Sequence, residues 1–467
     1  MEENITFLAE KENENEILKK IYALLEEKKF SLVRELLDPF PAADIGALFG
    51  EIDERIEPLL FRILPKEKAA EVFVEMESAV QERLILCFSD RELKEMLNEL
   101  YLDDTVDIIE EMPASVVARI LKAASAASRK QINELLRYPK NSAGSLMTTE
   151  FVRLKRNMTV KDAFDVIRAE AIDKETVYTC YVTDENRHLL GVISAKTLLL
   201  SSYETPLSDI MEENVVYAYT LTDREEVAQM FNRYDFLALP VVDTENRLVG
   251  IITVDDAMDV MQEEAEEDFT KMAAITPSET PYLKTSAFSI FLSRIPWLLI
   301  LMISATFTGM IISGFEAALS TCVALTAFIP VIMGTGGNSG SQSSVTVIRG
   351  LSVGEIGFRD AWRVIFKELR VSVLCAIALG AVSFGKILLV DRLLLSNDAV
   401  TVSVALVVSL TLAFTVICAK LIGAVLPILA KRIKLDPAVM ASPFITTIVD
   451  AVSLLVYFGV ASSLLSL

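Results

Sequence analysis

Residues 436–465 read DPAVMASPFITTIVDAVSLLVYFGVASSLL, and the apolar part of this stretch, Ala438–Leu465, carries one acidic side chain, Asp450, near its middle. A helix of this length crosses a bilayer, because a span needs about 20 predominantly apolar residues. Between Asp436 and the end of the chain there is no Lys or Arg to neutralise Asp450. An ionisable group at membrane depth is costly, and it marks a functional site by default.

A polar stripe leads to this carboxylate. Ser442, Thr446 and Asp450 follow one another at intervals of four residues, which places them on one face of a helix. We expect these three residues to line an ion path, with Asp450 binding the cation. The alternative is a protonated Asp450 that hydrogen-bonds a neighbouring helix.

Four further apolar segments precede this one, at residues 290–312, 319–345, 371–390 and 400–429. Together they predict a transmembrane domain over residues 286–467 with five spans. Basic side chains gather in the connections after the second and fourth spans, and basic connections face the cytoplasm. We therefore expect a multi-pass protein of the plasma membrane, with its N-terminal part in the cytoplasm and its C-terminus outside.

The predicted second span contains the stretch IPVIMGTGGNSGSQSSVTVIRGL at residues 329–351, which is rich in Gly, Ser and Asn. Such residues allow helices to pack closely, and they also expose oxygens that suit a hard or hydrated cation. We expect Gly337 and Asn338 to join the ion path at Asp450, with helix packing as the alternative. One carboxylate does not dehydrate Mg²⁺, whereas a symmetric dimer would bring two of them to a hydrated ion.

Charge is segregated along the chain. Of its 467 residues 52% are hydrophobic and 23% are charged, and from Ile290 onward 12 Lys and Arg stand against 8 Asp and Glu. The total charge of −21 therefore leaves −25 on the preceding part, which excludes nucleic-acid binding by phosphate neutralisation. The single histidine, His188, and five scattered cysteines provide neither a zinc site nor a His-based triad. This lack of soft ligands favours hard divalent cations.

The part before the membrane divides into three regions. Residues 1–138 carry apolar side chains at helical spacing with short breaks between them, which predicts a helical N-terminal domain. Two similar units follow, over residues 139–202 and 203–262. Met147 matches Met211 in these units, and Gly191 matches Gly250. A repeat of this length indicates a duplicated βα unit.

The two units resemble a tandem pair of CBS domains, a module that often binds adenine nucleotides. Gly250, Thr253 and Asp256 match its G-h-h-[ST]-x-x-[DN] ending in the second unit, whereas Thr197 replaces the acid in the first. The resemblance implies an adenine nucleotide such as ATP at Thr253 and Asp256.

An acidic connecting helix is expected over residues 255–285. Eight carboxylates and no base lie between Asp255 and Asp268. Apolar residues at positions 258, 261, 265, 269 and 272 form one stripe along this helix. Carboxylates three or four residues apart on a helix repel one another only weakly in water. When the helix packs against another surface, a cation is needed to neutralise them. The alternative is a solvated acidic face.

The order of helical domain, CBS pair, acidic helix and five spans resembles the MgtE family of magnesium channels. The most specific motifs are RIPWLLI at residues 294–300 and the stretches at 329–351 and 436–461. The resemblance implies a homodimer with its pore on the two-fold axis, Asp450 as the ion-coordinating residue, and Thr446 and Ser442 as pore-lining residues.

The resemblance also implies regulation by cytoplasmic Mg²⁺. The ion would bind between acidic surfaces of the N-terminal domain, the CBS pair and the connecting helix, and it would hold the pore shut. The matching acids in this chain are Asp103, Asp107, Asp223, Glu225, Asp235, Asp256, Asp259, Glu264, Glu267, Asp268 and Asp436.

The predicted fold class is a multidomain membrane protein with an all-α N-terminal domain, an α/β tandem CBS pair and a five-helix transmembrane domain. We expect a Mg²⁺ channel or transporter. A proton- or ion-coupled divalent cation transporter and a membrane-anchored nucleotide or metal sensor stay open as alternatives. An enzyme is not expected, because the chain contains no nucleophile–base pair, Walker motif or cofactor loop.

Overall fold

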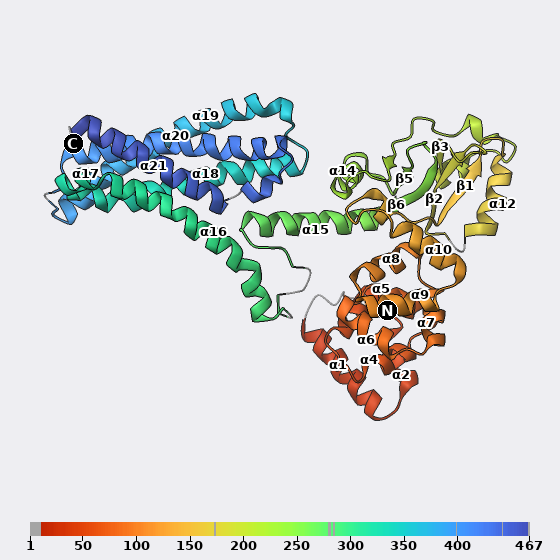
Figure 1. The fold of residues 1–467 in the computed structure, drawn as a ribbon. Helices are drawn as coiled ribbons and strands as arrows, with labels where there is room; N and C mark the ends of the chain where they lie inside the picture. The colour runs from red at the N-terminus through yellow and green to blue at the C-terminus, as the bar shows by residue number, and fades with distance from the viewer. Residues whose placement is uncertain are drawn as a thin grey trace, which may run out of the picture. The chain divides into compact units, whose positions relative to one another are not determined.

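The computed structural model describes residues 11–171, 174–278, 282–283, 285–397, 399–440 and 442–465. The chain forms two compact units, Met1–Val260 and Met261–Leu467, and the division falls within helix α15 (Val254–Met272). Figure 1 draws the elements in chain order from red to blue. The first unit holds the short helices and the strands, and the second holds the long apolar helices.

The N-terminal domain is an array of short helices, as its sequence predicts. Proline directly precedes three of them, at Pro41, Pro65 and Pro113, and each proline stops the preceding helix from continuing. A capping box between Ser89 and Glu92 starts another. The helices are α1 (Lys11–Glu26), α2 (Phe30–Leu37), α3 (Ala42–Phe49), α4 (Glu57–Ile63), α5 (Lys66–Val74), α6 (Ser78–Cys87), α7 (Asp90–Leu97), α8 (Leu102–Glu111), α9 (Ala114–Ala123) and α10 (Ala126–Leu135).

An aromatic cluster forms part of the core of this array. The ring of Phe61 lies 6.4 Å from that of Phe49, 6.0 Å from that of Phe73 and 5.2 Å from that of Phe88, measured between centroids. All four side chains are buried. Since they come from four consecutive helical segments, their packing holds α3 to α6 together.

Two three-stranded sheets of identical topology follow, which confirms the βα repeat. In each sheet the first strand pairs in parallel with the second, and the second pairs antiparallel with the third. A helix connects each parallel pair, as a parallel connection requires. The first CBS unit contains α11 (Ala143–Leu146), β1 (Phe151–Lys155), α12 (Val160–Glu170), β2 (Thr176–Thr183), β3 (Leu189–Ser194) and α13 (Ala195–Leu200). The second CBS unit contains β4 (Ala218–Tyr219), α14 (Arg224–Tyr234), β5 (Ala238–Val242) and β6 (Leu248–Thr253).

The repeated methionine of each CBS unit lies against the repeated glycine of the other unit. A Cβ atom on Gly250 would lie 2.7 Å from the sulfur of Met147, and one on Gly191 would lie 3.0 Å from the sulfur of Met211. The chain just after each methionine forms a β-bridge to the last strand of the other unit. Each unit therefore completes the sheet of the other, and glycine is needed where the exchanged segment passes.

Helix α15 does not bury its predicted apolar stripe. Its buried residues are Ala257 and Val260, whereas Met258 and Phe269 of the stripe are 60% and 71% exposed. The apolar stripe of α15 is therefore a surface feature of the described chain.

The second unit consists of long helices and short connecting turns. Helices α18, α20 and α21 pack against one another, α19 packs on α20, and α16 packs on α21. The elements are α16 (Ala287–Gly314), α17 (Glu316–Thr321), η3 (Val323–Phe328), α18 (Ile329–Ser352), η4 (Phe358–Asp360), α19 (Ala361–Lys386), the π-helix η5 (Ile387–Leu394), α20 (Val402–Arg432), η6 (Pro437–Met440) and α21 (Ser442–Leu465).

The predicted spans differ in hydropathy, and the bounds of the second one need a correction. Four helical segments of the described chain have the length and hydropathy for a membrane crossing: Ala287–Gly314, Phe358–Leu394, Val402–Arg432 and Pro443–Leu465. Helix α18 is long enough but too polar to count among them, because of its Gly, Ser and Asn residues. It also begins at Ile329 rather than at Leu319, since a 3₁₀ turn and the N-terminal proline, Pro330, start a new helix there.

Candidate cation sites

Asp450 lies on α21 with a half-buried side chain. No described side chain forms a hydrogen bond or ion pair with its carboxylate. The hydroxyls near it are occupied by their own helix: Thr446 donates to the carbonyl of Pro443 at 2.9 Å, and Ser453 donates to that of Val449 at 2.6 Å. Asp450 is therefore a carboxylate without a protein counter-ion in the described chain.

Gly336 and Gly337 of α18 serve close helix packing. A Cβ on Gly336 would lie 2.7 Å from Thr415 of α20, and one on Gly337 would lie 3.1 Å from Thr446 of α21. These approaches support the packing interpretation of this stretch.

The predicted ion-path residues are thus only partly brought together. Gly337 and Thr446 are in contact. Asn338 is exposed on the surface of the single chain, and the side chain of Ser442 lies outside the described part of the structure.

Three acids of the second unit surround one lysine. Lys271, at the end of α15, lies 2.6 Å from a carboxylate oxygen of Asp436 and also forms an ion pair with Glu267. Ser352 at the end of α18 donates a hydrogen bond to Asp268. Burial raises the pKa of Asp268, and the charges of Asp436 and Glu267 add to the rise. Glu264 lies on the same helix.

Lys271 is the counter-ion that the sequence analysis missed. Its pKa is raised above the ordinary lysine value, because hydrogen bonds to Asp436 and Glu267 outweigh the opposing effect of burial. The lysine therefore stays charged and offsets part of the repulsion among the three acids.

A second acidic group lies in the first unit, where no lysine of the described residues forms an ion pair with Asp103, Asp104 or Asp256. Burial raises the pKa of Asp103 to about 7, with the neighbouring charge of Asp104 as the next cause. Burial and the charges of Asp256 and Asp255 raise the pKa of Asp104 to about 7. Burial also raises the pKa of Asp256 to about 7, and the charges of Asp103 and Asp255 add to the rise. The hydrogen bond that Asp256 accepts from the Thr253 hydroxyl at 2.6 Å opposes this rise. These groups destabilise one another as carboxylates, so they hold either protons or a cation.

Other acids extend this group. The pKa of Asp107 is raised by the surrounding protein and by the charges of Asp256 and Asp103, although the side chain keeps contact with solvent. Burial raises the pKa of Glu175 to about 8, with Asp103 as the main charged cause. The pKa values of Glu75 and Asp259 are also raised by burial and by a neighbouring acid, although both side chains reach solvent.

The structure thus joins four predicted residues, Asp103, Asp107, Asp256 and Asp259, with acids that the sequence analysis did not select. Asp104, Glu75, Glu150 and Glu175 come from turns or helix ends without a recognisable motif. The doublets Asp103–Asp104 and Asp255–Asp256 are the only sequence signal for part of this set.

The three predicted acids on the second CBS unit lie on helix α14 or at its ends. Asp223 caps α14 by accepting the backbone N–H of Glu225 at 2.9 Å. The Glu225 carboxylate accepts a hydrogen bond from Gln229, and Asp235 ends the same helix in a left-handed conformation with φ of 53°. These residues therefore lie at the two ends of α14.

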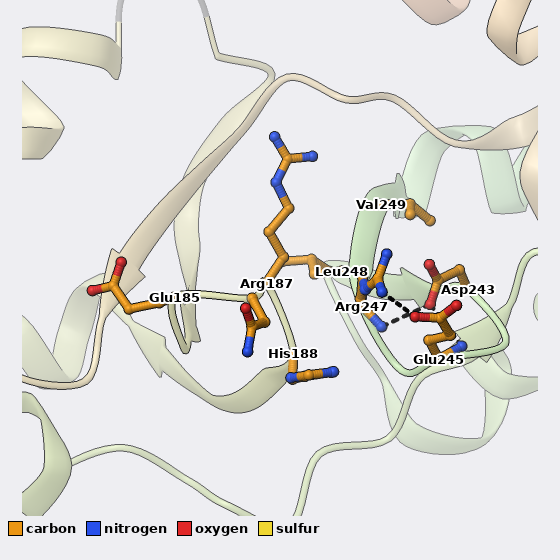
Figure 2. A pocket seen from close by; sticks show the side chains of 9 residues that line it. Glu185, Arg187, His188, Asp243, Glu245, Arg247, Leu248 and Val249 are labelled. Carbon is orange, nitrogen blue, oxygen red and sulfur yellow. Dashed lines mark hydrogen bonds and ion pairs between the residues drawn. The ribbon is translucent and has the colours of Figure 1, made fainter.

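Neither of the two predicted nucleotide positions lines the cavity that the CBS pair forms. That cavity measures about 810 Å³ and lies between the hairpin turns of the two CBS units (Figure 2). Arg187 and His188 line it from the first turn, and Asp243, Glu245 and Arg247 line it from the second. Its mixed charges and the ion pair between Arg247 and Glu245 leave no uniform anion-binding surface.

The architecture defines a multi-pass membrane protein whose N-terminal part contains a CBS pair and clusters of carboxylates. Family models for the MgtE intracellular N domain match residues 40–141, those for the CBS domain match 143–204 and 207–263, and that of the MgtE divalent cation transporter matches 329–460.

Two relatives cover nearly the whole chain. The magnesium transporter MgtE of Thermus thermophilus is 36% identical over 94% of this chain and 97% of its own length. That of Bacillus subtilis is 34% identical over 96% of this chain and 97% of its own length. The chain therefore belongs to the MgtE family.

A solved structure resembles the soluble part. The cytosolic domain of the Mg²⁺ channel MgtE, crystallised in complex with ATP, is 37% identical and superimposes with a TM-score of 0.50. The similarity covers 52% of this chain and 99% of that structure. The predicted family and fold class are thus confirmed.

Proposed function

We propose that this chain transports Mg²⁺ across the plasma membrane through a pore in which Asp450 binds the hydrated ion. Asp450 carries the proposal, because a half-buried carboxylate on a membrane helix without a described counter-ion needs a cation for a partner. Thr446 and Ser442 would line the path toward it, and Gly337 and Asn338 would contribute oxygens from α18. The near full-length similarity to magnesium transporters supports Mg²⁺ as the substrate.

The pore would form between two copies of the chain. One carboxylate supplies too little charge to compete with the hydration shell of Mg²⁺, whereas two carboxylates across a two-fold axis could bind the ion with its water. Asn338 is exposed in the single chain and would be covered in such a dimer. The basic connections would face the cytoplasm together with the soluble part, and the C-terminus would lie outside.

Cytosolic Mg²⁺ would close this pore. The domains proposed for this regulation are residues 1–138, the CBS units 139–202 and 203–262, and the connecting segment 255–285. The ligands would be Asp103, Asp107, Asp223, Glu225, Asp235, Asp256, Asp259, Glu264, Glu267, Asp268 and Asp436. An ion that bridges such acids stabilises the packed arrangement, and its loss releases that arrangement.

ATP would bind the CBS pair, and the related cytosolic domain that was crystallised in complex with ATP supports this proposal. Thr253 and Asp256 are the proposed contacts. Because the Asp256 carboxylate already accepts the Thr253 hydroxyl beside other acids, nucleotide and Mg²⁺ binding would be coupled there.

Flux into liposomes tests the transport proposal. Purified protein should carry Mg²⁺ without a proton gradient, and Asp450→Asn should reduce the flux at least tenfold while the protein still inserts. Asp391→Asn is the matched control, since Asp391 is ion-paired with Lys386 and should leave flux unchanged. Flux that requires a proton gradient would support a coupled transporter, and no flux with any of Mg²⁺, Mn²⁺, Co²⁺ and Ni²⁺ would support a membrane-anchored sensor.

A further inference from the structure

A small cavity in the N-terminal domain is lined by none of the acids that the proposed regulation uses. It measures about 360 Å³ and lies among α4, α5, the end of α6 and α7. We propose that this cavity binds a small organic cation, in which a short aromatic or branched apolar body carries one ammonium group. The inference goes beyond the proposed transport function and does not depend on it.

Five apolar side chains form the inner wall of the cavity. Phe61 and Phe88, whose ring centroids lie 5.2 Å apart, form one part of this wall. Leu64, Ala69 and Met96 form the rest, and all five side chains are buried. An apolar group that moves from water onto this wall gains free energy roughly in proportion to the area that it covers. Small-molecule sites usually measure about 300–1,000 Å³, so this cavity suits a ligand at the small end of that range.

Two ion pairs join α4 and α5 to α7 at the edge of the cavity. The Nε atom of Arg62 lies 2.7 Å from a carboxylate oxygen of Glu92, and the ammonium of Lys66 lies 2.6 Å from one of Glu95. All four side chains line the cavity and are partly exposed to solvent. Exposed ion pairs contribute little to stability, so the edge of the cavity can adjust to a ligand.

The two paired glutamates stay ionised and occupied. Hydrogen bonds from Arg62 and Lys66 lower the pKa values of Glu92 and Glu95, respectively, to about 2. Glu95 also accepts a hydrogen bond from Arg91 at 2.8 Å. Neither glutamate therefore offers a free carboxylate to a ligand near neutral pH.

Glu99 is the lining carboxylate that stays open. It follows Glu92 and Glu95 at intervals of seven and four residues, close after the end of α7, and it is exposed. No basic side chain of the described chain forms an ion pair with it. An ammonium group can pair with Glu99 without displacing a protein group. A carboxylate ligand would first have to separate Arg62 or Lys66 from its partner, so the charges favour a cation over an anion.

Isothermal titration calorimetry of the full chain in detergent tests the inference, with phenethylamine as the probe. This molecule joins a phenyl ring to an ammonium group through two carbon atoms, and it should bind saturably with one molecule per chain. Two further probes each lack one of its interactions: 3-phenylpropionate has the same ring and spacer with the opposite charge, and ethylamine has no ring. Both should bind about tenfold more weakly or less than that. No saturable binding of phenethylamine, or tighter binding of 3-phenylpropionate, would overturn the inference.

Two variants locate the bound amine. Ala69→Leu adds three carbon atoms to the wall and should abolish saturable binding, because they fill the cavity. Glu99→Gln should weaken binding about threefold, since it removes one exposed ion pair. Glu71→Gln is the matched control, because it removes an exposed carboxylate from α5 that does not line the cavity, and it should bind as the wild type does.

The exposed position of Glu99 keeps the test decisive if Ala69→Leu fails to fold, because Glu99→Gln changes no buried side chain. Affinity for phenethylamine that is unchanged in Glu99→Gln would overturn the proposed cation site. Affinity that is unchanged in a folded Ala69→Leu variant would place the amine outside the cavity and would overturn it as well.

Discussion

The acidic groups of the two units contain similar side chains but differ in what neutralises them. In the second unit Glu267 and Asp436 contact Lys271, and Asp268 accepts a hydrogen bond from Ser352. In the first unit Asp103, Asp104 and Asp256 have mainly each other as charged neighbours. An acidic cluster with its own lysine can stay packed without metal, whereas a cluster of acids alone cannot stay both charged and packed. Dependence on divalent cations should therefore be stronger in the first unit.

The largest effect is expected from neutralising the first cluster. Asp103→Asn, Asp107→Asn and Asp256→Asn combined should leave the pore conducting at internal Mg²⁺ concentrations that close the wild type, because three of the carboxylates that the cation would bridge are neutralised. The Mg²⁺ concentration for half-closure should rise at least tenfold in a liposome flux assay. A control that neutralises the exposed acids Glu71, Glu170 and Glu204 should close normally. Normal closure of the test variant would remove the first cluster from the gate.

The second effect concerns the lysine. Lys271→Gln should destabilise the second unit by about 1–3 kcal/mol, because it leaves Glu267 and Asp436 partly buried without their charged donor. Added Mg²⁺ should restore part of this stability, so that the second cluster acquires the cation dependence of the first. Thermal unfolding in detergent with EDTA or Mg²⁺ measures both changes, with Lys434→Gln as an exposed control. A variant as stable as the wild type would mean that Lys271 is not the counter-ion that matters.

The third effect is a pH dependence of the first unit in the absence of divalent ions. The folded pKa of Asp103, Asp104 and Asp256 is about 7, above the ordinary 3.8, so the folded state binds more protons than the unfolded state between these values. Stability is therefore lost as pH rises from about 4 to 8. Hydrogen exchange of α8 should become at least tenfold faster at pH 8 than at pH 6 after correction for intrinsic rates, on the order of 1.4 kcal/mol.

Helix α7 supplies the internal control for this experiment. Glu92 and Glu95 have pKa values lowered to about 2 by Arg62 and Lys66 respectively, so their contribution is lost only in acid. Protection of α7 should be the same at pH 6 and pH 8. If α8 and α7 respond alike, the acidic cluster does not govern the local stability of α8.

The smallest effect is a difference in stability between substitutions on the buried and the exposed face of α15. Val260→Ala should lower stability by roughly 1–2 kcal/mol, because Val260 is buried and the change leaves a cavity. Met258→Ala should change it by no more than about 0.5 kcal/mol, because the side chain is 60% exposed. Chemical denaturation of both variants checks this order. A large cost for Met258→Ala at a concentration where the chain self-associates would show that the apolar stripe is covered by another copy.

Much of the architecture could be predicted from local patterns. Helical spacing, the Met and Gly repeat and the apolar segments predicted the three kinds of domain, since each pattern reflects the periodicity of one element. The start of α18 was predicted ten residues too early, because apolarity alone does not show that Pro330 begins a new helix. The stretch at Gly336 and Gly337 could not be assigned between ion path and packing until its neighbours Thr415 and Thr446 were known.

Charge and hydropathy belong to the chain itself, so they were enough to identify Asp450 as a lone carboxylate in an apolar segment and to show that the soluble part is strongly acidic. Which acids share a site became known from the folded chain. Glu150 and Glu175 meet because two parallel strands start side by side, and Lys271 meets Asp436 across a long separation in sequence. Electrostatic interactions depend on distance and burial in space, and neither can be read from the order of residues.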